Sequence, residues 1–214
     1  MHALKPPPSL SAEGSTSAYY DLNAQAYFDA TLHVDMSDLY DEFLRQIISG
    51  GRILDAGSGS GRDTLAFLKK GYEVDAFDSS PALAELSTRL TGVSTQVIRF
   101  QEFESAPRYD GIWACASLLH VPANELHDVL ARLLRALKPG GVLYISVKHG
   151  SDERVADDGR LFVDLDKISI RNLFAKFPDV TLRKIWLTGG EGSLRGRDNW
   201  LNVLAVKAPE SGNQ

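Results

Sequence analysis

Three alternating glycines, Gly57, Gly59 and Gly61, separate a short apolar run from a charged segment in the stretch ILDAGSGSGRD. Where a strand leads through a glycine-rich turn into a helix, backbone N–H groups and the positive end of the helix dipole face the same point. Glycine also tolerates positive φ angles and lets a ligand approach the backbone closely. The stretch therefore predicts a binding site for an anionic group.

The spacing of these glycines limits which anion can bind. A dinucleotide-binding turn reads G-x-G-x-x-G, and Arg62 stands where that pattern has its third glycine. A P-loop would end in Gly-Lys-Ser/Thr, and this turn does not. The pattern argues against a pyrophosphate and against a nicotinamide-dependent oxidoreductase, and it favours a smaller anion such as a carboxylate.

An acidic residue ends the next apolar run along the chain. Asp78 lies 17 residues after Gly61 and 21 after Gly57, so in a parallel sheet its carboxylate would sit beside the glycine loop. There it would accept two hydrogen bonds from a ribose diol, unless it serves only as a turn or helix-capping residue. A single ligand that carries both a carboxylate and a ribose would satisfy both features.

The elements that must position these residues alternate between apolar runs and segments of helical period from Gly51 onward. We expect strands at 52–56, 72–78, 95–100, within 109–119, and at 142–147, 180–188 and 199–208. We expect helices at 17–30, 38–48, 62–70, 81–90, 126–137 and 166–177, and a polar loop after 147. This alternation is typical of a parallel sheet with crossover helices.

The composition is that of one ordinary domain. The 214 residues are 43% hydrophobic, and the net charge of −5 comes from mixed signs, which disfavours large nucleic acids as partners. The single cysteine, Cys115, rules out an internal disulfide and suits a reducing compartment. No run approaches the roughly 20 apolar residues of a membrane helix. We expect a cytoplasmic monomer or homodimer with a disordered lead-in at 1–18, one domain at 19–208 and a tail at 209–214, and without a metal site.

Four motifs follow one another along the chain: ILDAGSGSG, VDAFDSSPAL, YDGIWACASLLHV and LKPGGVLYIS. In this order and spacing they resemble the successive motifs of class I S-adenosylmethionine-dependent methyltransferases. The resemblance extends from Tyr19 to Ala208. It implies a Rossmann-like α/β fold, with a mostly parallel seven-stranded sheet, helices on both faces and an antiparallel last strand. It also implies S-adenosylmethionine as cofactor and S-adenosylhomocysteine as product.

The resemblance assigns parts of the cofactor to particular positions. Asp55 and the glycine loop would surround the methionine part, Asp78 would bind the ribose, and the end of the fourth strand would pass near the reactive methyl group. The adenine ring would lie after the third strand, where RFQEFE replaces the usual acidic residue followed by a small one. The implied cofactor-binding positions are Asp55, Gly57, Ser58, Gly59, Gly61, Asp78, Ser79, Phe100, Gln101, Glu102, Ala114, Cys115, Ala116, Tyr20 and Tyr27.

Methyl transfer depends mainly on aligning the acceptor and excluding water, because a sulfonium is already a good leaving group. His120, just past the fourth strand, is the candidate catalytic base for an acceptor that must lose a proton, unless it only caps a backbone group. Residues 19–50 would form a lid, in which Tyr20 and Tyr27 face the sulfonium, unless Tyr27 and Phe28 only pack on the sheet. For Cys115, apolar neighbours would raise the thiol pKa and favour a packing role over a nucleophilic one.

The acceptor would lie between loops at the same edge of the sheet. These loops carry Lys148, Arg160, Arg195, Arg197 and Trp200. Two inward-facing cations would suit an anionic or planar acceptor, although such charges more often form a solvated rim. Relatives of this layout act on small metabolites or on metalloid oxyanions such as tellurite, so a small-molecule methyltransferase is favoured. The alternatives are a regulator that binds S-adenosylmethionine or S-adenosylhomocysteine without catalysis, and a protein or nucleic-acid methyltransferase.

Overall fold

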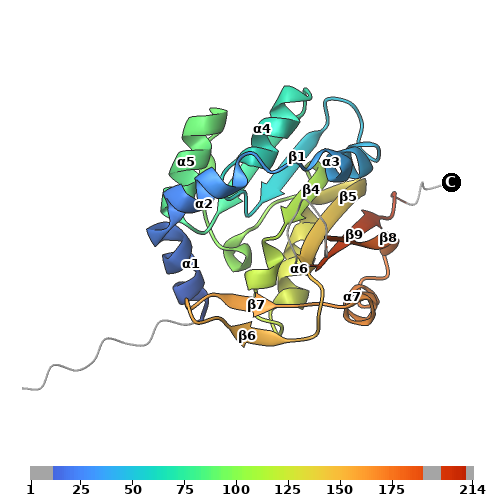
Figure 1. The fold of residues 1–214 in the computed structure, drawn as a ribbon. Coiled ribbons are helices and arrows are strands. Elements are labelled where there is room, and N and C mark those ends of the chain that lie inside the picture. The colour runs from blue at the N-terminus through green and yellow to red at the C-terminus, as the bar shows by residue number, and fades with distance from the viewer. Residues whose placement is uncertain (1–11, 190–198, 211–214) are drawn as a thin grey trace, which may run out of the picture.

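A seven-stranded sheet in the order β3-β2-β1-β4-β5-β9-β8 forms the centre of the molecule (Figure 1). The computed structural model describes residues 12–189 and 199–210. The strands are β1 (Arg52–Ala56), β2 (Glu73–Asp78), β3 (Thr95–Val97), β4 (Tyr109–Cys115), β5 (Leu137–Lys148), β8 (Val180–Gly189) and β9 (Asn199–Lys207). β1 to β5 pair in parallel, and β9 is antiparallel to both of its neighbours. The predicted fold class is confirmed.

The register of the parallel strands brings their carboxyl ends to one edge. Ala56 at the end of β1 pairs with Phe77 near the end of β2, and Asp55 pairs with Trp113 on β4. At the end of β4, Cys115 pairs with Ser146 on β5. The loops that follow β1, β2 and β4 therefore meet at the same edge, which is where open α/β sheets bind their ligands.

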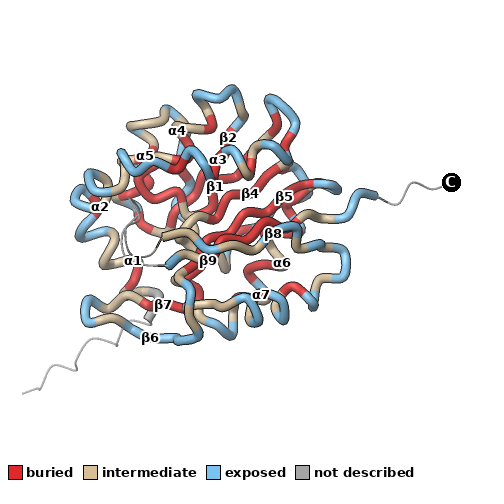
Figure 2. Tube along the Cα trace, turned by 45° about the vertical axis from the view of Figure 1, so that its right-hand side comes forward, coloured by how far each residue is buried: buried red, intermediate tan, exposed pale blue. Residues whose placement is uncertain are grey.

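Helices cover both faces of the sheet. α3 (Ser37–Leu44) and α4 (Arg62–Lys69) pack on one face, with α5 (Pro81–Thr91) beside α4, and α6 (Leu126–Ala136) and α7 (Lys167–Phe174) pack on the other (Figure 1). Because successive side chains of a strand point to opposite faces, Ile53 belongs to one core and Leu54 to the other. One core lies on each face of the sheet, and the buried strands run through the middle of the molecule (Figure 2).

The amino-terminal region differs from the sequence prediction. Two helices, α1 (Ala12–Leu22) and α2 (Ala24–Thr31), replace the single helix expected at 17–30, and the chain turns at Asn23, whose side chain donates to Tyr19 O. The prediction of a disordered lead-in at 1–18 is wrong for residues 12–18, which lie in α1. Thr16 explains this error, because its buried hydroxyl accepts a hydrogen bond from the backbone of Leu161, a distant partner.

Two short elements also depart from the expected pattern. The polar loop expected after β5 contains a hairpin of β6 (Glu153–Val155) and β7 (Leu161–Val163), in which all three β7 residues are buried. β7 contacts both α1 and the 3-10 turn η2 (Leu118–His120). The third strand ends at Val97, and the 3-10 turn η1 (Phe100–Glu102) takes the rest of its expected length. These elements are too short for their periodicity to be recognised in the sequence.

Within the described ranges, no helix has both the length and the apolar character that crossing a membrane requires. Among the same residues, histidine, cysteine and carboxylate side chains form no group of three or more that could hold a metal ion.

One buried carboxylate connects three elements behind the glycine loop. Asp63 on α4 is 6% exposed and accepts hydrogen bonds from Tyr40 Oη on α3 and from Trp113 Nε1 on β4. Arg62 donates to both of its oxygens, at 2.6 and 2.9 Å. Burial alone would raise the pKa of Asp63, but the charge of Arg62 and these donors hold it below its usual value. Asp63 therefore stays ionised and fixes the position of Arg62.

We expect Asp63→Ala to lower the free energy of unfolding by about 3–5 kcal/mol, because it leaves the partly buried Arg62 guanidinium without its counter-charge. Urea unfolding followed by circular dichroism measures this loss. Asp38→Ala, which removes an exposed carboxylate from the first turn of α3, is the control and should change stability by less than about 0.5 kcal/mol. Equal losses in the two variants would contradict the role given to Asp63.

Candidate functional site

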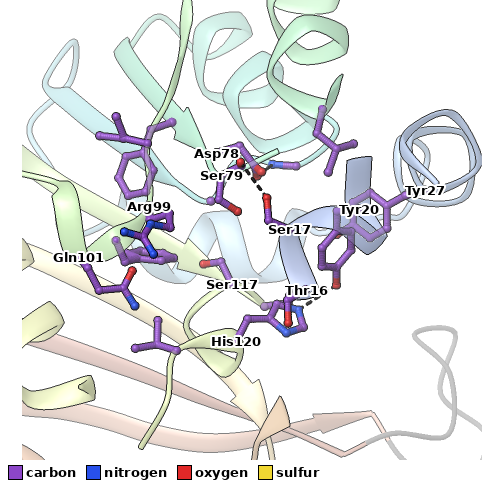
Figure 3. A pocket seen from close by; sticks show the side chains of 18 residues that line it. Thr16, Ser17, Tyr20, Tyr27, Asp78, Ser79, Arg99, Gln101, Ser117 and His120 are labelled. Carbon is purple, nitrogen blue, oxygen red and sulfur yellow. Dashed lines mark hydrogen bonds between the residues drawn. The ribbon is translucent and has the colours of Figure 1, made fainter. Parts of the chain in front are cut away.

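A cavity of about 730 Å³ lies at the carboxyl edge of the sheet, between the ends of β1, β2 and β4 and helix α1 (Figure 3). Ten of the residues singled out from the sequence line it: Tyr20, Tyr27, Gly57, Gly59, Asp78, Ser79, Phe100, Gln101, Ala116 and His120. They come from five separate parts of the chain and meet only in the fold. We call this space the first cavity.

The glycine loop is shaped by close contacts as well as by its backbone angles. Gly57 has a φ of +76°, and a Cβ atom there would lie 2.5 Å from Ser117 Cβ. Gly59 has a φ of +54°, and the ring of Tyr27 lies against it. The amides of Gly57 and Ser58 both donate to Phe77 O at 2.9 Å, which holds the loop against β2. Larger residues would displace the loop from both neighbours.

Asp78 is buried at the end of β2 and points toward this loop. Its Oδ2 accepts a hydrogen bond from Gly59 N at 2.8 Å, and its Oδ1 accepts one from Ser80 N at 2.9 Å. Burial raises the pKa of Asp78 even though these amides lower it. Asp78 thus makes turn contacts and also lines the first cavity. Each carboxylate oxygen keeps a further lone pair that can accept from a ligand hydroxyl.

The three candidates after the third strand divide into two groups. Phe100 and Gln101 line the first cavity, and the Phe100 ring meets that of Phe77 edge-on at 5.1 Å. Glu102 is exposed and does not line the first cavity, because its carboxylate accepts hydrogen bonds from the backbone and guanidinium of Arg99. The expectation that Glu102 contacts the cofactor therefore has no support in the geometry.

Five other predicted positions lie outside the lining of the first cavity: Asp55, Ser58, Gly61, Ala114 and Cys115. Asp55 accepts a hydrogen bond from Thr64 Oγ1 at 2.6 Å, and burial together with the charge of Asp63 raises the pKa of the Asp55 carboxyl. Gly61 permits α5 to approach, since a Cβ atom there would lie 2.6 Å from Ser87 Oγ. Ala114 is fully buried in the core.

Ser58 and Cys115 differ in what surrounds their polar atoms. The buried Ser58 hydroxyl has no hydrogen-bond partner in the described part of the chain. Such an atom is uncommon in a folded protein and indicates a site for a missing partner. Burial raises the pKa of the Cys115 thiol to about 12, so this thiol stays protonated, in agreement with a packing role.

The first cavity also has lining residues outside the implied cofactor-binding positions. Thr16 and Ser17 come from the part of α1 that was expected to be disordered, and Ser17 Oγ donates to Ser79 O at 3.0 Å. Ser117 Oγ donates to Ala56 O at 2.7 Å, which joins the end of β4 to the end of β1. Arg99 lines the cavity from just before η1. Ser117 lies at the end of the fourth strand, which was expected near the methyl group, whereas no motif marks Thr16 or Ser17, whose positions depend on contacts between distant segments.

A second cavity, of about 1040 Å³, shares Tyr20, Tyr27, Ala116 and His120 with the first. Lys148, Arg160 and Trp200 line it, as do Arg62 and Phe162. From the sequence, Lys148 and Arg160 could have formed a solvated rim, but both line this cavity. Arg195 and Arg197 lie outside the described residues.

His120 lies where the two cavities meet, and its hydrogen bonds define its protonation. The Leu161 carbonyl can only accept, so the Nδ1–H of His120 donates to it at 2.6 Å. In the neutral ring Nε2 then accepts from Tyr20 Oη, at 2.8 Å (Figure 3). Burial lowers the pKa of His120 to about 4, and the charges of Arg160 and Lys148 act in the same direction. The ring is therefore neutral at ordinary pH.

The backbone between the cavities is strained. Ala116 follows β4 with a φ of +52°, a conformation that residues with a Cβ adopt at a cost. Its amide donates to both Ser146 O and Ser146 Oγ, at 3.0 and 2.9 Å, and these bonds hold the conformation in place. Strain of this kind is common at functional sites.

Helix α1 closes the first cavity through a set of polar contacts. Asp21 accepts hydrogen bonds from Ser80 Oγ and from Ala82 N, at 2.7 and 2.8 Å, at the amino-terminal end of α5. The negative carboxylate lies where the helix dipole is positive. Tyr20 meets Tyr27 edge-on at 5.1 Å and connects α1 to α2.

The sheet order, the glycine loop and the acidic residue at the end of β2 define a Rossmann-like fold of the methyltransferase type. A family model described as a methyltransferase domain matches residues 28–186. The chain belongs to this methyltransferase-domain family.

Similar proteins carry related names. An uncharacterized methyltransferase of Staphylococcus carnosus is 27% identical over 126 residues, which are 55% of this chain and 61% of that protein. A ubiquinone biosynthesis O-methyltransferase of Xylella fastidiosa is 36% identical over 109 residues, which are 46% of this chain and 42% of that protein. The chain thus spans about half the length of the curated relatives it matches.

Solved structures share the whole fold. The Burkholderia thailandensis 1,6-didemethyltoxoflavin-N1-methyltransferase, crystallised with 1,6-didemethyltoxoflavin and S-adenosylhomocysteine, aligns with a TM-score of 0.73. The alignment covers 96% of this chain and 93% of that chain at 23% identity. At this identity the likeness establishes the architecture.

Acid should destabilise the protein partly through His120. The pKa of His120 is about 4 in the folded protein, against 6.5 for the ordinary group. Between these values the unfolded chain binds more protons, so stability falls as pH is lowered through this window. Between pH 7 and pH 4.5, the free energy of unfolding of His120→Gln should fall by about 2 kcal/mol less than that of the parent protein. Urea unfolding at the two pH values measures this difference. His33→Gln, at an exposed position, should behave like the parent; an unchanged pH dependence in His120→Gln would refute the neutral assignment.

Proposed function

We propose that the protein is an enzyme that transfers a methyl group from S-adenosylmethionine to a small molecule, in the cytoplasm. The observation that carries this proposal is the pair of adjoining cavities. One is built from the glycine loop and the end of β2, the other is lined by basic and aromatic residues, and the two meet at Tyr20, Tyr27, Ala116 and His120. A transferase needs such a junction, because its two substrates must meet at one point.

The residues of the first cavity fit S-adenosylmethionine. Ser58, whose hydroxyl has no hydrogen-bond partner among the described residues, and the buried Asp55 lie just outside the lining, in and beside the glycine loop. A cationic amino group bound at the loop would stabilise the ionised form of Asp55, whose pKa is raised. Asp78 has lone pairs for ribose hydroxyls, and Phe100 offers an apolar wall for adenine. When bound, the cofactor supplies a methyl group on a positively charged sulfur.

The chain's own residues would orient the acceptor and remove its proton. Tyr20 and Tyr27 belong to both cavities and exclude water from the junction. His120 is neutral, and its Nε2 accepts a hydrogen bond from Tyr20 Oη, so a proton from the acceptor would reach it through the tyrosine hydroxyl. The Leu161 carbonyl holds Nδ1–H, which keeps the ring in the tautomer that a base requires.

A small acceptor is favoured over a macromolecule. Part of the second cavity is open to solvent, and about 330 Å³ of it can be occupied by small molecules, a volume within the range of small-ligand pockets. The names of the similar Xylella fastidiosa and Burkholderia thailandensis proteins also refer to methylation of small molecules. The net charge of −5 does not suggest a nucleic-acid substrate.

Calorimetric titration tests the cofactor directly. S-adenosylmethionine and S-adenosylhomocysteine should bind with one site per chain, and NAD should not bind, because Arg62 replaces the glycine that a pyrophosphate loop needs. Release of S-adenosylhomocysteine in the presence of a panel of thiols, amines, phenols, carboxylates and metalloid oxyanions then tests catalysis. Binding of NAD without binding of S-adenosylmethionine would refute the proposal, and cofactor binding without any turnover would favour the regulator.

Asp78→Ala should weaken binding of S-adenosylhomocysteine by about 1–3 kcal/mol, which is the contribution of hydrogen bonds to a charged group. Glu102→Gln is the matched control, because it changes a carboxylate near the same cavity that faces Arg99 instead. Calorimetry on both folded variants measures the difference. Unchanged affinity in Asp78→Ala, or a comparable loss in Glu102→Gln, would show that the ribose does not bind at Asp78.

A further inference from the structure

The second cavity has an uneven charge. Arg62, Lys148 and Arg160 line it, and its described lining residues include no aspartate or glutamate. The whole chain has 28 acidic and 23 basic residues, so this distribution departs from the protein's average. A cavity of one sign attracts a ligand of the opposite sign.

We infer that the methyl acceptor is a planar hydroxy compound that carries a negative charge, with its anionic group held between Lys148 and Arg160. This inference rests on the proposed methyltransferase function and specifies the substrate class of the same site.

The cations gather around one aromatic ring. Lys148 Nζ lies 5.0 Å from the centroid of the Phe162 ring, and Arg160 Cζ lies 5.1 Å from it. Each cation is attracted to the ring face, but the two positive charges repel each other. Asp158 already accepts from Nε and Nη2 of Arg160, so an anionic group in the cavity would be held by Lys148 and by the remaining nitrogen, Nη1, of Arg160.

The carboxylates that pair with the arginines do not fill the cavity. Asp63, which lies in the protein interior, accepts two hydrogen bonds from Arg62. Asp158 pairs with Arg160 at 2.7 Å, and its side chain is 33% exposed and outside the lining. Both pairs anchor the guanidinium groups and leave the space of the cavity to a ligand.

The walls favour a flat molecule. Tyr20, Tyr27, Phe162 and Trp200 present aromatic side chains to the same space, with Leu119 and Met36 nearby. Aromatic walls bind a planar ring by stacking and by edge-to-face contacts. An aromatic acceptor therefore satisfies this part of the lining, whereas a compact inorganic oxyanion would leave it uncovered.

His120 points to a hydroxyl as the reacting group. A hydroxyl needs a base, and in the balanced step its proton passes to Tyr20 Oη while the Tyr20 proton passes to His120 Nε2, and the acceptor oxygen forms a bond to the methyl carbon. The electron pair of the broken carbon–sulfur bond stays on the sulfur, which becomes a neutral thioether. Lys148 and Arg160, which hold the anionic group at the other end of the acceptor, disfavour a protonated amine in that place.

Three ligands of one shape test the charge preference: 4-hydroxybenzoate, 4-hydroxybenzyl alcohol and 4-hydroxybenzylamine. Their affinities are measured by calorimetry with the full chain saturated by S-adenosylhomocysteine. We expect the carboxylate to bind at least about tenfold more tightly than the alcohol, and the amine to bind most weakly. A preference for the alcohol or the amine, or no binding by any of the three, would overturn the inference.

Two variants distinguish the effect of the cavity's own charge on ligand preference from the effect of charge elsewhere on the surface. Lys148→Gln should reduce the preference for the carboxylate about tenfold and leave S-adenosylhomocysteine affinity unchanged. Arg154→Gln is the control, because Arg154 also lies near Phe162, at 5.4 Å, but does not line the cavity. It should keep the preference. Equal effects in the two variants would overturn the assignment of Lys148.

The same titrations distinguish the two levels of the argument. If S-adenosylhomocysteine itself does not bind, the proposed methyltransferase function fails. If it binds and the three ligands show no preference for the carboxylate, the function stands and the substrate class is wrong.

Discussion

The buried charge of Asp63 is the constraint on which the site depends. This carboxylate holds α3 through Tyr40, β4 through Trp113, and the guanidinium of Arg62. A buried charge is tolerated only with such partners, so these elements have little freedom to move apart. Because Arg62 also lines the second cavity, one ion pair connects the stability of the core with the shape of the site. The charge of Asp63 also helps to raise the pKa of the neighbouring Asp55.

The parallel sheet supplies the rest of the geometry. Its register brings the ends of β1, β2 and β4 together, and Ser117 joins two of them by donating to Ala56 O. The small residues of the loop allow this approach, since a Cβ atom at Gly57 would collide with Ser117. Strain at Ala116 is the cost of turning the chain sharply there, and hydrogen bonds to Ser146 offset it. The junction of the two cavities is therefore a consequence of how three strand ends are packed.

The sequence predicted the parts of the site that follow strands. Gly57, Asp78 and Gln101 each stand at or just after a strand, so the order of motifs was enough to place them in the first cavity. Thr16 was missed because what orders it is a hydrogen bond from Leu161, 145 residues away. The direction of Lys148 and Arg160 was equally hidden, since it depends on the β6–β7 hairpin, whose strands are too short to recognise. Local patterns encode local structure, and these features arise from distant contacts.

The same distant contacts make His120 dependent on two segments outside the central sheet. The β7 carbonyl of Leu161 fixes Nδ1–H, and Tyr20 on α1 donates to Nε2. Thr16 on α1 accepts from the amide of that same Leu161, so α1 and β7 are held to each other as well as to the histidine. A displacement of α1 would open the first cavity, remove the Tyr20 donor and loosen the residue that sets the histidine tautomer. The contacts that close the first cavity are thus the same ones that orient the His120 ring.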